Sequence, residues 1–262
     1  YDPTTVGNQP CGKQNQVKMY APQGYSYTPT SGIWQTVWLE QVPNIYVDDI
    51  DIIMNSTEYI IFNISLMGPE SSNIIFDIYD PTDNDVATFN ISDYISGDYI
   101  QVYFDDVFGE PKLWSPDNPF LYDLIVKIVD SDNNIIDQVT SYFGVRTITL
   151  GHYALSNGTI LSRPLLNNNT IFLNGWLDQG FWPDGIYTQP SDEALIFDIK
   201  SIKTFGFNMA RVHQKINPER YYYYADLYGI LLLQDMVQKP WVTPNNTTLG
   251  VEYFSNDLAM MV

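Results

Sequence analysis

The sequence predicts a multidomain protein in which an all-β sandwich is followed by the first part of a parallel α/β domain. Its 262 residues are enough for about two or three domains of ordinary size. Short segments rich in Ile, Val, Tyr and Phe follow one another between residues 33 and 146, with polar turn clusters between them. After about residue 148, strand-like and helix-like segments alternate instead. This alternation is typical of a parallel sheet.

The stretch before Ile33 shows no regular pattern. Pro3, Pro10, Pro22 and Pro29 interrupt any helix or strand there. We expect this stretch to be the tail of a preceding domain.

The sandwich is predicted from seven strand-like segments. Most of them alternate apolar and polar residues, and clusters such as Pro81–Asp85 and Asp130–Asn134 between them favour turns. Seven short strands with this spacing are typical of a β-sandwich. The expected strands are residues 34–40, 46–53, 59–66, 73–79, 99–104, 122–129 and 135–143.

The first strand–helix unit is expected in residues 170–206. Residues 170–173 (Thr-Ile-Phe-Leu) form a short apolar strand, and Ser191 is a suitable N-cap for the helix that follows. Asp192 and Glu193 in its first turn interact favourably with the helix dipole, and Gly206 is expected to end it. The apolar face of the helix consists of Leu195, Ile199 and Ile202.

A second unit follows the first. Residues 207–211 are a predicted strand, and Asn217 is a suitable N-cap before Pro218. The helix 219–228 ends at Gly229, and its run of four tyrosines is expected to serve packing. The apolar run 230–233 then indicates a parallel strand buried on both faces.

Polar and aromatic residues follow the three predicted parallel strands. Because ligands of parallel α/β domains bind outside the carboxyl ends of the strands, we expect these residues to converge on one pocket. The alternative for His213 is a half-buried histidine that ends a strand, and Asp178 and Asp184 are equally suited to forming turns. The candidates are Asp178 and Trp182 after the first strand, Arg211 and His213 after the second, and Gln234 and Asp235 after the third.

Composition excludes several classes of partner. A net charge of -19 repels nucleic acids and anionic membrane surfaces, so we expect a neutral substrate and neither a nucleic-acid nor a membrane partner. Cys11 is the single cysteine, which excludes a disulfide within the chain and a cysteine-rich zinc site. We expect no metal and no cofactor.

Localisation rests on glycosylation sequons. They fit an extracellular or lysosomal protein. The alternative is that an Asn-rich sequence produces them by chance in a cytoplasmic protein. The sequons begin at Asn55, Asn63, Asn90, Asn157, Asn168, Asn245 and Asn246.

Five motifs, in order along the chain, resemble the signatures of glycoside hydrolase family two, which includes β-galactosidases, β-glucuronidases and β-mannosidases. The resemblance implies that residues 1–43 end a jelly-roll sugar-binding-like domain. It further implies that residues 44–147 form an immunoglobulin-like sandwich and that residues 148–262 begin a (β/α)8 TIM barrel. The motifs are residues 32–40 (GIWQTVWLE), 113–122 (LWSPDNPFLY), 143–146 (FGVR), 172–175 (FLNG) and 206–213 (GFNMARVH).

This resemblance implies a retaining glycosidase that uses two glutamates, one as acid/base and one as nucleophile. Both are expected beyond Val262, because a barrel of about 250 residues cannot be complete here. We therefore assign no catalytic residue in this chain, and expect Asp178, Trp182, Arg211, His213 and Asp235 to bind the sugar. The chain has only 12 Lys and Arg residues. Because the carboxylate of a uronide needs a cationic partner, this small number favours a neutral sugar.

One segment departs from the commoner text of the family. Residues 177–185 (LDQGFWPDG) stand where a histidine-bearing loop usually follows Asn-Gly, which leaves the identity of the sugar open. A different class of function also remains: a non-catalytic carbohydrate-binding or scaffold protein with the same sandwich domains. A glutamate after each of the fourth and seventh barrel strands would favour the enzyme.

Overall fold

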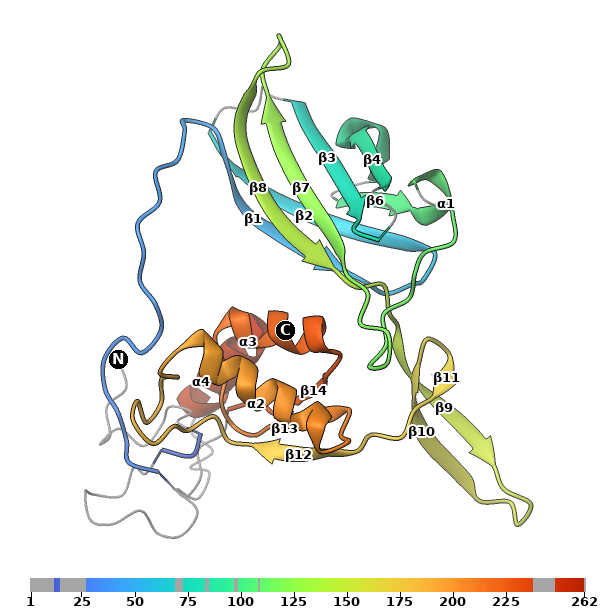
Figure 1. Ribbon diagram of the computed structural model, residues 1–262, viewed down its shortest axis with the longest axis vertical. Coiled ribbons are helices and arrows are strands. Elements are labelled where there is room, and N and C mark those ends of the chain that lie inside the picture. The colour runs from blue at the N-terminus through green and yellow to red at the C-terminus, as the bar shows by residue number, and fades with distance from the viewer. Residues whose placement is uncertain are drawn as a thin grey trace. The chain divides into compact units, whose positions relative to one another are not determined.

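The computed structural model describes residues 12–14, 27–68, 73–82, 85–96, 99–107, 109–237 and 248–261. The chain divides into two compact units (Figure 1). Unit 1 consists of Tyr1–Trp38 and Leu173–Val262, and unit 2 is Leu39–Phe172. Cys11 and the sequons at Asn245 and Asn246 lie outside the described residues.

Unit 2 contains the predicted sandwich. One antiparallel sheet has the order β1-β2-β6-β5 and the other the order β4-β3-β7-β8. The strands are β1 (Tyr46–Ile53), β2 (Tyr59–Met67), β3 (Asn73–Asp80), β4 (Asp85–Asn90), β5 (Ile95–Ser96), β6 (Tyr99–Tyr103), β7 (Tyr122–Val129) and β8 (Ile135–Phe143). Two short helices, η1 (Ile91–Tyr94) and α1 (Phe104–Val107), flank β5 and β6.

Alternation along the strands places the core between the two sheets. In β7, every second residue from Tyr122 to Ile128 is buried, as expected for a strand with one face against a core. Phe62 of β2 and Phe76 of β3 meet edge to face, with ring centroids 4.9 Å apart. Tyr122 stacks on Phe143 of β8 at 5.2 Å. The Phe62–Phe76 contact joins the two sheets into one core, whereas the Tyr122–Phe143 pair lies within one sheet.

Six of the seven predicted sandwich strands are confirmed, with ends that match within one residue. The prediction of a strand at residues 34–40 is wrong, since this stretch has no strand structure. Leu39 is fully exposed and Val37 is 72% exposed. The apolar composition of this stretch was therefore not sufficient for pairing with another strand. The short β4 and β5 were not predicted.

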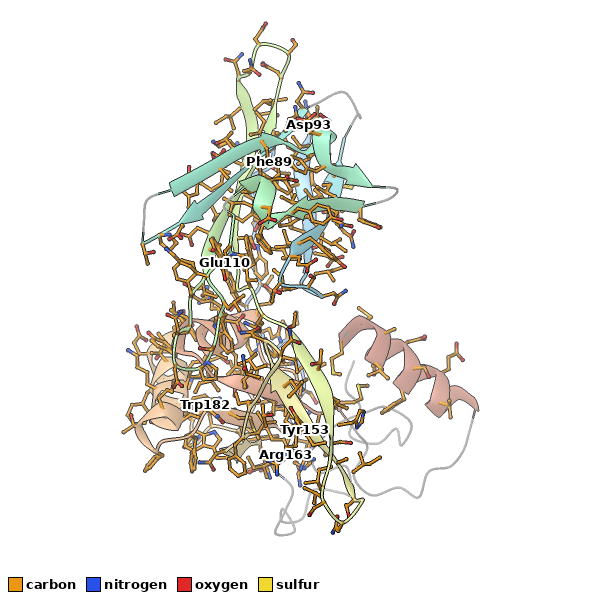
Figure 2. The ribbon with its side chains drawn as sticks, turned by 90° about the vertical axis from the view of Figure 1, so that its right-hand side faces the viewer. Phe89, Asp93, Glu110, Tyr153, Arg163 and Trp182 are labelled. Atoms are coloured by element: carbon orange, nitrogen blue, oxygen red, sulfur yellow. The ribbon has the colours of Figure 1, made fainter. Side chains whose placement is uncertain are left out.

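A β-hairpin follows the sandwich within unit 2 and was not predicted. Strands β9 (Ile148–Ala154) and β10 (Ile160–Leu166) pair antiparallel, and β11 (Asn169–Thr170) adds a third, two-residue strand. Tyr153 on β9 and Arg163 on β10 are labelled in Figure 2.

Unit 1 contains a three-stranded parallel sheet with the order β12-β13-β14 (Figure 1). Its elements are β12 (Gly175–Asp178), α2 (Asp192–Thr204), β13 (Met209–Val212), α3 (Glu219–Tyr228) and β14 (Leu231–Gln234). A further helix, α4 (Thr248–Met261), follows. None of the helices in the described part of the chain is long and apolar enough to cross a membrane.

The helix signals were mostly correct. Ser191 caps α2, its side chain accepting a hydrogen bond from the Ala194 N–H at 3.3 Å. Gly229 ends α3 in the left-handed conformation, with φ of 71°, which glycine adopts without the steric cost of a Cβ. The expected capping by Asn217 is wrong: Pro218 is the N-cap, and the buried Asn217 directs its N–H to the Tyr222 hydroxyl instead.

The first parallel strand lies further along the chain than predicted. Residues 170–173 were expected to form it, but β11 ends at Thr170 and pairs with β10, and Phe172 is 78% exposed. The strand that pairs with β13 is Gly175–Asp178. A run of apolar residues therefore did not mark the strand, because neighbouring backbone, not hydrophobicity alone, decides where pairing occurs.

Candidate sugar-binding site

The two faces of the parallel sheet have different surroundings. Trp176, Ala210 and Leu232 lie side by side in the register and pack toward the helices. Leu177, Arg211 and Leu233 form the neighbouring row, and both leucines are 50% exposed. Because side chains alternate along strands, this second row lies on the face opposite the helices. Arg211 therefore belongs to the open face of the sheet.

Arg211, His213 and Asp235 meet at the carboxyl ends of β13 and β14, and we call them the strand-end cluster. Arg211 Nε donates to Asp235 Oδ1 at 3.0 Å, and its Nη2 donates to Oδ2 at 2.8 Å. His213 Nδ1 lies 2.5 Å from the same Oδ2. The convergence expected from the positions of the three residues at strand ends is thus present in the geometry.

Hydrogen bonds keep Asp235 ionised. Partial burial of the carboxyl group opposes its ionisation, but the hydrogen bonds from Arg211 and His213 outweigh this and hold the pKa of Asp235 below its ordinary value. The same pairing raises the pKa of Arg211. The side chains of Arg211, Asp235 and His213 are 48%, 20% and 16% exposed. The cluster is therefore partly open to solvent and partly fixed by its own bonds.

Asp178 lies at the same edge of the sheet but has different contacts. Its backbone oxygen accepts a hydrogen bond from the His213 N–H at 2.7 Å, so the ends of β12 and β13 are adjacent. Its carboxylate accepts from the Gly180 N–H at 2.7 Å and from the Tyr221 hydroxyl at 2.8 Å. Asp178 therefore shapes the turn after β12 and binds helix α3, away from the open face.

Trp182 and Asp184 belong to residues 179–188, the first part of the connection between β12 and α2, which we call the 179–188 loop. Trp182, labelled in Figure 2, is half-buried and packs against the core of unit 1. Asp184 is exposed. Among the residues that the structure describes, neither Trp182 nor Asp184 forms a hydrogen bond or ion pair with the strand-end cluster. Their role in binding sugar stays a prediction.

A cavity of about 240 Å³ lies between β12 and the helices. It is lined by Trp176, Leu177, Asp178, Asp198, Ile199, Ile202 and Tyr221. Burial, followed by the nearby charge of Asp178, raises the pKa of Asp198. The same two causes raise the pKa of Tyr221 well above its ordinary range. This cavity is on the helix side of the sheet, so it is distinct from the strand-end cluster.

Two residues near the strand ends, Tyr222 and Lys215, were not singled out for the site by the sequence, whereas Gln234 was a candidate. Gln234 Nε2 donates to the Lys215 backbone oxygen at 2.9 Å, and Tyr222 donates to Gln234 Oε1 at 2.8 Å. Lys215 is fully buried. The tyrosine run of α3 therefore does more than pack, since it also orders the strand ends. The sequence gives no sign that Lys215 is buried, because it follows the end of a strand, where lysines are usually exposed.

No metal cluster is visible in the part of the chain that the structure describes: His, Cys, Asp and Glu do not gather there in groups of three or more.

These observations define a class of protein: an antiparallel sandwich joined in one chain to a parallel strand–helix module with polar side chains at its strand ends. Residues 46–146 match the family model of glycosyl hydrolases family 2. A β-galactosidase of Lactococcus lactis is 27% identical over 221 residues, which cover 82% of this chain and 20% of that protein. A putative β-glucuronidase of Formosa agariphila is 30% identical over 128 residues, 48% of this chain and 11% of that protein.

Solved structures show the same fold. The crystal structure of Ruminococcus gnavus β-glucuronidase superimposes with a TM-score of 0.61 at 19% identity, covering 84% of this chain and 35% of that one. Residues 46–146 therefore resemble a domain of glycosyl hydrolases family 2, and a longer stretch of the chain is similar to β-galactosidases. It spans about one fifth of the length of the β-galactosidases from Lactococcus lactis and Halalkalibacterium halodurans.

Proposed function

We propose that this chain is part of a glycoside hydrolase that cleaves terminal β-glycosidic bonds of neutral sugars. The observation that supports this most is the strand-end cluster, which gathers a guanidinium, an imidazole and a carboxylate where parallel α/β domains bind ligands. The relatives named β-galactosidase and β-glucuronidase support the same class of reaction.

Further parts of the proposal concern domains and mechanism. The parallel sheet is the start of a TIM barrel, residues 44–147 are an immunoglobulin-like sandwich, and residues 1–43 end a jelly-roll domain. Two glutamates outside this chain serve as acid/base and nucleophile in a retaining mechanism, with their carboxyl groups about 5 to 5.5 Å apart. The small share of the relatives that this chain covers supports this division of labour.

The strand-end cluster suits hydroxyl groups better than a carboxylate. Asp235 already neutralises Arg211 through two hydrogen bonds, so an anionic sugar gains less from this guanidinium than from an unpaired one. Asp235 in turn is a strong acceptor for sugar hydroxyls, because its carboxylate stays ionised. His213 provides a second polar group whose orientation Asp235 fixes.

The test is turnover of a panel of nitrophenyl β-glycosides by the protein that contains this chain. We expect hydrolysis of at least one neutral glycoside, galactoside or mannoside, at a higher kcat/KM than that of the glucuronide. The 262-residue chain by itself is expected to be inactive, because the proposal places the two glutamates outside it. Absence of turnover by the longer protein, together with binding of oligosaccharide, would establish the non-catalytic alternative instead.

A further inference from the structure

Lys215 is a fully buried lysine just beyond the strand-end cluster. Its side chain is 0% exposed, and it lies two residues after His213. Its ammonium group donates hydrogen bonds to the backbone oxygens of Gly180 and Tyr187, the latter at 2.7 Å. The two aromatic rings nearest to it are those of Tyr187 and Trp34, whose centroids lie 4.6 Å and 5.0 Å from Nζ. Carbonyl dipoles and ring faces thus surround the cation.

A buried ammonium group is costly, and in the described part of the chain no carboxylate accepts a hydrogen bond from this one. Burial lowers the pKa of Lys215 to about 8, although the charge of Asp178 opposes the shift. A methionine or leucine would fill a similar volume without this cost. An apolar side chain could not donate hydrogen bonds to two carbonyls, those of Gly180 and Tyr187, which lie seven residues apart in one loop.

Backbone hydrogen bonds within the 179–188 loop fix its conformation between the carbonyls of Gly180 and Tyr187. Trp182 and Ile186 exchange two backbone hydrogen bonds at 2.8 and 3.1 Å, and the Thr188 N–H donates to Gly185. Gly180 adopts φ of 66°, and a Cβ added there would lie 2.5 Å from Lys215 Cδ. The lysine stem is therefore in van der Waals contact with the loop as well as bonded to it.

A segment from the start of unit 1 rests on the same loop. Tyr27 stacks on Phe181, with ring centroids 3.8 Å apart and planes at 10°. The Trp34 ring meets Tyr187 edge to face at 4.6 Å, and its backbone oxygen accepts a hydrogen bond from the Thr188 hydroxyl at 2.8 Å. The Lys215 ammonium group lies against both rings of this contact, so Lys215 connects the stretch after β13, the loop and the segment around Trp34.

The position of this assembly is close to the candidate site. The 179–188 loop begins directly after β12, and the Asp178 backbone at that point bonds to His213. On its other side, the Lys215 backbone oxygen is fixed by Gln234, the neighbour of Asp235 in sequence. Displacement of Lys215 would therefore move the loop relative to the strand-end cluster.

We propose that Lys215 is a positioning residue: its buried ammonium group fixes the 179–188 loop, and the segment around Trp34, as one wall of the sugar site next to the strand-end cluster. The role of this wall in sugar binding rests on the proposed function. The fixing of the loop rests on the contacts alone.

The experiment compares Lys215→Met with the matched control Lys200→Met in the protein that contains this chain. Lys200 also lies over an aromatic ring, that of Tyr228 at 4.7 Å, but it is exposed on α2 and does not contact the loop. Hydrogen exchange is followed at the amides of the 179–188 loop and of β13. We expect Lys215→Met to raise loop exchange about tenfold or more while β13 stays protected, and Lys200→Met to leave both unchanged.

Kinetics provide the second readout. With the loop displaced, we expect KM for the best nitrophenyl glycoside to rise about fivefold or more and kcat to change less, because the lost wall binds sugar and does not react. Unchanged loop exchange in Lys215→Met would overturn the proposal. Faster loop exchange with an unchanged KM would overturn the part that concerns the sugar. If the unmodified protein hydrolyses no glycoside, the proposed function fails, and the exchange data alone decide the role of Lys215.

A second variant covers the case in which Lys215→Met does not fold. Lys215→Gln is the milder change: its amide can still donate a hydrogen bond, but the side chain is shorter and the ammonium group that reaches both Gly180 and Tyr187 is gone. We expect it to accelerate exchange in the same loop amides and to raise KM in the same direction. Normal protection of the loop in this variant would count against the proposal.

Discussion

The burial of Lys215 predicts a specific dependence of stability on pH. In the unfolded chain its pKa is near the ordinary value of 10.5, whereas in the folded protein it is about 8. Between these two values the unfolded state binds one more proton than the folded state, so stability rises with pH. The stabilisation is complete above about pH 10.5 and is lost as the pH falls through about 8.

The size of the effect follows from the two pKa values. The full difference of about 2.5 units corresponds to about 3 kcal/mol, and the portion between pH 7.5 and 9.5 amounts to about 2 kcal/mol. Urea unfolding followed by tryptophan emission measures it, because five of the six tryptophans belong to unit 1. The free energy of unfolding of unit 1 should therefore rise by about 2 kcal/mol over this pH interval.

The variant Lys215→Met isolates this contribution. It should lose the rise, whereas Lys200→Met should keep it, so that the difference between the two variants changes by about 2 kcal/mol from pH 7.5 to 9.5. Parallel pH profiles for the two variants would refute the reasoning, because they would show that Lys215 binds its proton equally well in the folded and unfolded states.

Three other predictions concern the site, a helix and the sandwich. Asp235→Ala should reduce kcat/KM by a factor equivalent to about 2 kcal/mol or more of lost transition-state stabilisation, the scale of lost hydrogen bonds to a charged group. The control Asp132→Ala, exposed in a turn of the sandwich, should leave kcat/KM unchanged; equal kcat/KM for the two variants would return Asp235 to a structural role. Ser191→Ala should destabilise unit 1 by about 1 kcal/mol in urea unfolding, since α2 loses its side-chain cap; an unaltered midpoint would show that the cap contributes little. Phe62→Ala should cost about 3 to 5 kcal/mol in unit 2, where the ring is 0% exposed; a thermal midpoint within a degree of the original would contradict the assigned core.

The sandwich was predictable from sequence because several local signals agree in its strands. In β7, alternation, β-branched residues and flanking turn clusters all agree, and the predicted bounds Tyr122–Val129 are those observed. Residues 34–40 carry a similar composition but remain exposed and without strand structure. Local pattern indicates which segments are able to pair, whereas the presence of a neighbouring strand depends on the whole fold.

The site was predictable in part. The rule that side chains past parallel strands meet at one edge anticipated that Arg211, His213 and Asp235 lie together, and their hydrogen bonds show this. The rule did not distinguish Asp178, which turns to the helix side and binds Tyr221. Nor did it find Lys215, because its burial depends on rings and carbonyls from two distant segments, around Trp34 and in the 179–188 loop.

The central claim is that the strand-end cluster holds a sugar. The most direct measurement is a crystal structure of the protein that contains this chain, with the glycone product of its best nitrophenyl glycoside bound. We expect sugar hydroxyls within hydrogen-bonding distance of Asp235 and of Arg211 or His213, on the face of the sheet opposite α2 and α3. A sugar bound elsewhere, with all three side chains in contact only with one another and with water, would contradict the account.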